Sequence, residues 1–229
     1  MISVNGIWLF SLIGFGAISL VLLILLLTSS PFRSKEFSLL RNFPYELAKM
    51  SGNNFQLFKT FMFVLTGLAF SPLFVISPLI KEFGDLGFLT IFITCIFGLA
   101  AITNSLLFFF DARYTKTHII LVTVAMSLTL LANALSTLLS ILVYKVYLDM
   151  HESHAMSLVL AIVSGLLAAI SLLLIVNPKL ANWAKLQSDD SGEEKVYSRG
   201  KVFILALSEW VSILLSILGE IIFIVSIIK

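Results

Sequence analysis

Long apolar runs alternate with short polar segments along the chain. Six windows hold roughly 20 or more mainly apolar residues, which is the length that an α-helix needs to cross a hydrocarbon core of about 30 Å. Lipid offers no hydrogen bonds to the backbone, so an apolar run of this length has to be helical. The pattern therefore predicts transmembrane helices at residues 7–27, 59–80, 87–110, 117–144, 155–177 and 202–228.

The composition places almost the whole chain in the membrane. Of 229 residues, 59% are hydrophobic and 12% are charged, and the mean hydropathy is +1.05, which excludes a soluble domain of average composition. Only two loops have appreciable length, at 28–58 and 178–201. No basic segment precedes the first window and no small-residue cleavage site follows it, so we expect a retained helix rather than a signal peptide. The fold class predicted is an all-α integral membrane protein, with a single polytopic domain over residues 1–229.

The basic residues are distributed unevenly between the two sides of the predicted helices. Twelve Lys and Arg residues lie in the loops that follow the first, third and fifth windows, whereas only Lys81, Lys145 and Lys229 lie on the opposite side. Cytoplasmic loops are the ones enriched in Lys and Arg. We therefore expect both long loops in the cytoplasm, both termini outside, and a location in the cell membrane.

The first cytoplasmic loop carries an amphipathic pattern. Phe37, Leu40, Leu47 and Met50 recur at helical spacing among basic residues, which is typical of a segment that lies in the membrane interface. We expect this segment to be broken at Pro44 and to bring its basic side chains to anionic lipid head groups. The alternative is an ordinary juxtamembrane loop with flanking charges.

Small residues mark one face of the fifth window. Ser157, Ala161, Gly165 and Ala169 follow one another at four-residue spacing, which lets two helix backbones approach closely. We expect a helix-packing seam here. A protein partner or a second copy of the chain could use the fifth or the sixth helix in the same way.

Two acidic residues lie inside the last apolar window. Glu209 and Glu220 are eleven residues apart, which at about 100° per residue brings them to one helix face, with Ser212 and Ser216 between them. An isolated charge at this depth costs a few kcal/mol or more, so each acid should be protonated, paired or next to a wet cavity. This face of the helix should point into the protein or toward a partner.

Groups that could satisfy these acids are few. No Lys or Arg lies deep in a predicted helix, which leaves amides and hydroxyls, with Asn104, Asn133 and Thr137 as the candidates. One hypothesis is that hydrogen bonds to such groups make the acids a packing face. A second is a proton or cation path, in which the acids bind the ion near either end and the serines pass it between them. A third pairs the acids with a cation on another subunit.

Catalytic and metal-binding patterns are otherwise lacking. His151 and His154 are three residues apart, whereas the H-E-x-x-H zinc motif needs four, so they offer at most a surface metal site, and a polar turn explains them as well. Cys95 is the single cysteine and has no disulfide partner within the chain. We find no Gly-rich phosphate loop, no Ser-His-Asp set and no histidine pattern for haem, and we expect no enzyme, no cofactor and no nucleic-acid partner.

Two functions of different kinds remain. One is a small ion-coupled secondary transporter or channel-like protein that uses Glu209 and Glu220. The other is a non-catalytic subunit or assembly factor of a larger membrane complex. The lipid bilayer is a partner in both cases.

Overall fold

The computed structural model describes residues 37–50, 85–110, 115–150, 155–177 and 203–227. These residues form one short helix and four long ones. The helices are α3 (Pro44–Met50), α6 (Asp85–Leu106), α7 (Thr115–Asp149), α8 (Ala155–Ile175) and α9 (Ile204–Ile227).

The four long helices are each long and apolar enough to cross a membrane. The prediction of an all-helical membrane protein is confirmed for this part of the chain. The predicted helices at 7–27 and 59–80 lie outside the described residues, and so do the long loop predicted after α8 and most of the first loop.

Two of the helix boundaries differ from the predicted windows by four residues or more. α6 ends at Leu106, four residues before the end of its predicted window. The chain turns there, and the Phe109 amide donates to the Leu106 carbonyl at 2.9 Å. α7 continues to Asp149, five residues beyond the end of its predicted window. Polar residues end an apolar window, but they do not end a helix. Its 35 residues span about 52 Å at 1.5 Å per residue, well over the ~30 Å of a hydrocarbon core. α7 therefore tilts in the bilayer or projects beyond it.

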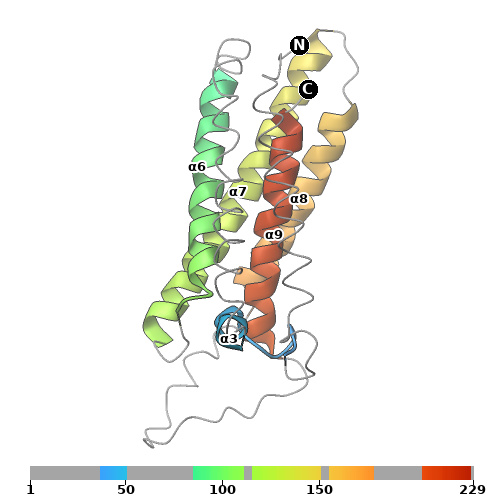
Figure 1. Cartoon of the computed structure of the whole chain (residues 1–229). Helices are drawn as coiled ribbons and strands as arrows, with labels where there is room; N and C mark the ends of the chain where they lie inside the picture. Colours follow the sequence, from blue (N-terminus) through green and yellow to red (C-terminus); the bar gives the residue numbers. More distant parts are fainter. Residues whose placement is uncertain (1–36, 51–84, 111–114, 151–154, 178–202, 228–229) are drawn as a thin grey trace, which may run out of the picture.

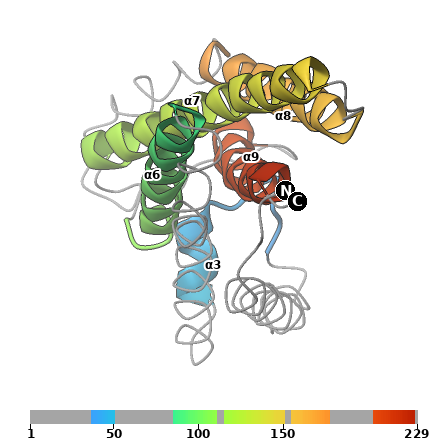
Figure 2. The same cartoon turned by 90° about the horizontal axis from the view of Figure 1, so that it is seen from above.

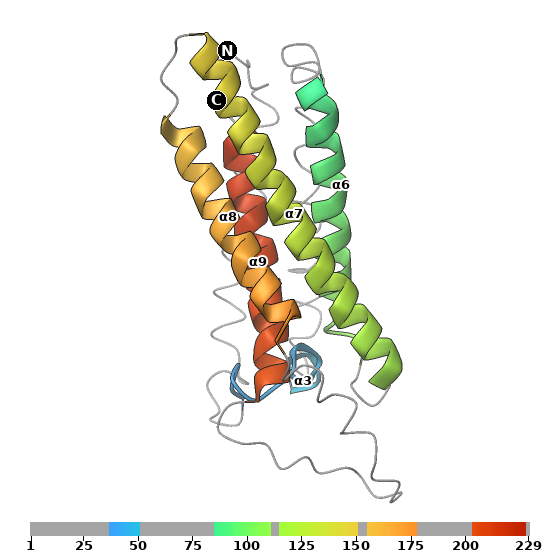
Figure 3. The ribbon, with the colours of Figure 1, turned by 180° about the vertical axis from the view of Figure 1, so that it is seen from behind.

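The long helices run alternately up and down and pack side by side (Figure 1). α7 contacts α6 on one side and α8 on the other, and α9 packs against all three (Figures 2 and 3). α3 lies at the end of the bundle where α9 begins (Figure 1). The face of α9 toward its neighbours is therefore enclosed by α6, α7 and α8.

Two apolar clusters lie at different levels along this bundle. One includes Phe37, Leu47, Leu107, Met126 and Ile213. The other includes Ile93, Phe97, Ala132, Leu139 and Phe223, with the Phe97 and Phe223 rings stacked at 5.4 Å. Between the two clusters, α6, α7 and α9 contribute the buried polar residues Asn104, Thr129 and Ser216. A polar layer thus crosses the middle of an apolar bundle.

The small-residue face of α8 differs from the predicted one. The buried residues are Ser157, Ala161, Ser164, Leu167 and Ser171, whereas Ala169 is exposed. A strict four-residue spacing advances by about 400° per step and so drifts around the helix, while mixed steps of three and four stay on one face. The Gly165 position still meets α7, because a Cβ there would lie 3.6 Å from Thr137 Cγ2.

No helix runs through Pro44: residues 37–43 are turns and irregular structure, and Pro44 is the first residue of α3. Proline suits this position, where no helical N–H bond is required. The Phe43 amide donates to Glu46 Oε2 at 2.9 Å, which is the bond from the third helical residue back to the cap in a capping box. Phe37 and Leu47 are buried in the protein core, whereas Leu40 is 45% exposed. The amphipathic pattern of this segment is thus used, at least in part, to contact the rest of the protein.

Candidate functional site

α9 presents a row of polar residues to the interior of the bundle. Glu209 is fully buried, and Ser212, Ser216 and Glu220 are each exposed by 4% or less. On its exposed side α9 carries lipid-compatible side chains such as Leu214 and Ile221. We call these four residues the α9 polar face.

Glu209 pairs with a histidine from α7. The Nε2 atom of His118 lies 2.9 Å from Glu209 Oε1, and both side chains have no exposed surface. The other ring nitrogen, Nδ1, lies 2.9 Å from the Phe110 carbonyl oxygen. A carbonyl oxygen only accepts, so Nδ1 carries a hydrogen and donates it.

This second bond determines what the pair can do with a proton. With Nδ1 protonated, a neutral imidazole offers an accepting Nε2, which suits a protonated Glu209. A charged imidazolium offers a donating Nε2, which suits a carboxylate. Both states hold one proton between Nε2 and Oε1, and without that proton two acceptors would face each other. The pair therefore holds one proton between Nε2 and Oε1.

Residues of the first loop cover this pair. The rings of Phe43 and Tyr45 approach the His118 ring edge to face, with centroids 5.7 and 5.9 Å away. Trp210 Nε1, next to Glu209 on α9, donates to the Asn42 carbonyl at 2.7 Å. Aromatic rings on the imidazole thus restrict access of water from the α3 end of the bundle.

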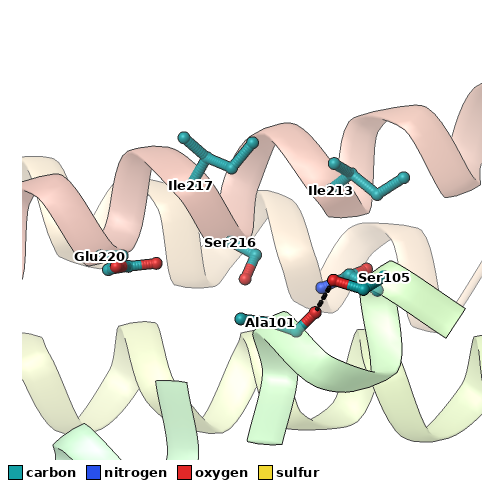
Figure 4. Close-up of a pocket in the computed structure, with 7 residues that line it drawn as sticks. Ala101, Ser105, Ile213, Ser216, Ile217 and Glu220 are labelled. Carbon is teal, nitrogen blue, oxygen red and sulfur yellow. Dashed lines mark hydrogen bonds between the residues drawn. The ribbon is translucent and has the colours of Figure 1, made fainter. Parts of the chain in front are cut away.

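Glu220 lies beside a small cavity between α6 and α9 (Figure 4). The cavity holds about 20 Å³, and a water molecule needs at least ~10–15 Å³ by the same measure. Its lining combines apolar groups with polar ones from both helices: Ala101, Asn104, Ser105, Ile213, Ser216, Ile217 and Glu220. Glu220 Oε1 and Asn104 Oδ1 are buried and have no hydrogen-bond partner among the described residues.

The predicted amide and hydroxyl partners do not bond to Glu209. Asn133 donates to the Thr129 and Leu215 carbonyls at 3.0 and 3.4 Å. Thr137 donates to Ser164 Oγ at 3.0 Å and so joins α7 to α8. Asn104 instead lines the cavity with Glu220.

Sequence reasoning missed His118 as the partner of Glu209. Only Lys and Arg were treated as possible buried cations. His118 lies at the edge of its apolar window, where a polar residue does not stand out from the adjoining loop. A histidine at the end of an apolar run was the available signal. His151 and His154 lie outside the described residues, within which no three metal-ligating side chains come together.

No protein-family model, no curated protein and no solved structure matches this chain. Its function therefore has to be inferred from the His118–Glu209 pair and from the carboxylate of Glu220 at the cavity.

Proposed function

We propose that this membrane protein is an ion-coupled transporter in which the His118–Glu209 pair takes up and releases a proton. The observation that supports this is the pair itself, which is fully buried and poised around one proton. Ionisable groups inside membrane proteins are costly, and they commonly serve proton relays and ion pathways. A hydrogen bond that only joined helices could use amides and hydroxyls, as Thr137 and Ser164 do between α7 and α8.

The α9 polar face supplies a path that leads away from the pair. Glu209 and Glu220 are about 16 Å apart along the helix axis, with Ser212 and Ser216 at intermediate positions. Ser212 Oγ is buried and has no hydrogen-bond partner within the described residues, so a serine hydroxyl is available there as both donor and acceptor. Protons or small cations would move between the two acids along this face.

The charge distribution gives the path a direction. With both termini outside, the beginning of α9 faces the cytoplasm, and Glu220 lies toward the outer side. α3 and the His118–Glu209 pair then form the cytoplasmic end of the path. The basic residues of the first loop would lie near the anionic head groups of that leaflet.

Proton flux through reconstituted protein tests this proposal. Liposomes that contain the protein and an internal pH-sensitive dye receive a pH step, with Na⁺ on both sides. We expect faster dissipation than in empty liposomes, and we expect Glu209→Gln to abolish the difference because it removes the exchangeable proton.

A matched control uses a polar side chain on the lipid side. Thr123 is exposed, and its hydroxyl bonds only to the Ile119 carbonyl of its own helix, so Thr123→Val should keep the wild-type rate. Wild-type protein no faster than empty liposomes, or folded Glu209→Gln with full flux, would overturn the proposal.

A further inference from the structure

The cavity at Glu220 has the features of a binding site for an ion. We propose that it binds one small monovalent cation, with Na⁺ as the preferred ion, through Glu220, Asn104 and Ser216. Figure 4 shows the Glu220 and Ser216 side chains entering the same space from α9, opposite α6.

The first argument comes from the unsatisfied oxygens. Glu220 Oε1 and Asn104 Oδ1 both line the cavity, both are buried, and neither has a hydrogen-bond partner among the described residues. Asn104 already uses its Nδ2 group on Thr129 Oγ1 at 3.4 Å, which leaves its carbonyl oxygen for the cavity. Buried polar atoms are rarely left unsatisfied, so we expect an occupant between these oxygens that can satisfy both, which means a hydrogen-bond donor or a cation.

The second argument comes from the type and charge of the ligands. Carboxylate, amide carbonyl and hydroxyl oxygens are hard donors, which suit hard cations rather than soft metals. Ser105 Oγ donates to the Ala101 carbonyl at 2.6 Å, and so its lone pairs remain available to the cavity (Figure 4). Glu220 is the one acid in the lining, and a single negative charge is neutralised by a monovalent ion but not by a divalent one.

The third argument is size. The volume of about 20 Å³ accommodates one water-sized particle, so a single dehydrated monovalent ion fits where a hydrated one does not. Apolar clusters flank the polar layer on either side. A transport role for this ion rests on the proposed function, whereas its binding can be measured without any transport.

Equilibrium binding of ²²Na⁺ to the purified full-length protein in lipid nanodiscs tests the proposal. Ionic strength is held constant with choline, and K⁺ serves as the competing larger ion. We expect saturable binding of one Na⁺ per chain, with weaker competition from K⁺. Glu220→Gln removes the charge with almost no change in volume and should weaken binding by at least roughly 30-fold.

Further variants separate the cation site from folding and from the proton pair. Ser216→Ala should weaken binding by a smaller factor, and Thr123→Val should leave it unchanged. Glu209→Gln should lose proton flux yet retain Na⁺ binding, so failure of the proton proposal and failure of the cation proposal give different results. Absence of saturable binding to folded wild-type protein, as expected for a cavity that holds only water or a proton, would overturn the proposal. Equal affinity in folded Glu220→Gln would do the same.

Discussion

Gly219 lies on α9 against Asn133 of α7, directly before Glu220. A methyl group at this position would overlap the amide oxygen of Asn133 and lie 2.8 Å from its Cγ atom. The Asn133 side chain has no exposed surface, and it donates to the Thr129 and Leu215 carbonyls. It cannot swing aside without breaking these bonds, so Gly219→Ala should destabilise the protein.

Gly165→Ala is the matched control for this substitution. A Cβ at Gly165 would lie 3.6 Å from Thr137 Cγ2, which is an ordinary contact. Both variants gain about 1 kcal/mol of helix propensity from alanine, so this gain cancels in the comparison. Overpacking costs ~1–3 kcal/mol and a lost hydrogen bond in a membrane bundle costs ~0.6 kcal/mol. Gly219→Ala should therefore be less stable than Gly165→Ala by about 1.5–3.5 kcal/mol.

Unfolding of the purified variants in mixed detergent micelles measures this difference. Titration with sodium dodecyl sulfate gives the free energy of unfolding, and tryptophan fluorescence reports the transition. We expect Gly165→Ala to match or exceed the wild type and Gly219→Ala to fall below it. Equal stability of the two alanine variants would show that α9 does not approach Asn133 this closely, and the placement of Glu220 would be in error.

Two other predictions concern the end of the bundle where α3 lies. Replacing either His118 or Glu209 alone by leucine leaves a buried polar partner and should destabilise the protein by about 3–5 kcal/mol. The double replacement should cost much less than the sum of the two single replacements. Additive costs in this double-mutant cycle would contradict the pairing. Trp210→Phe removes the donor to the Asn42 carbonyl and should cost about 1 kcal/mol, with faster trypsin cleavage at the exposed Arg41. An unchanged cleavage rate relative to wild type would argue against this tether.

The sequence predicted those features that depend on spacing within one helix. Apolar windows located α6 to α9, because burial in lipid requires long uninterrupted apolar runs. The eleven-residue interval placed Glu209 and Glu220 on one side of α9, and the structure buries both. These inferences need only the period of the helix.

One feature that the sequence did not predict depends on contacts between helices. The partner of Glu209 is 91 residues away in the chain, and the position of α7 along the axis of α9 determines which residue that partner is. That position cannot be read from residue spacing within either helix, so it requires knowledge of how two helices are placed in space. Two other features are local to the sequence: a four-residue spacing drifts around α8 and leaves Ala169 exposed, and Glu46 lies three residues after Phe43, in the capping pattern of a helix that begins at Pro44.

The bond between Trp210 and Asn42 joins residues 168 positions apart, and the Phe203 amide similarly donates to the Leu40 carbonyl. Residues 37–50 are synthesised long before α9, by roughly 10–30 s at 5–20 residues per second. During that interval α3 has no α9 to dock on, and the imidazole of His118 has no Glu209. The polar interior of this bundle is thus completed only when α9 has been inserted, so a chain that stops before α9 leaves His118 without Glu209 and leaves the Asn42 carbonyl without the Trp210 donor.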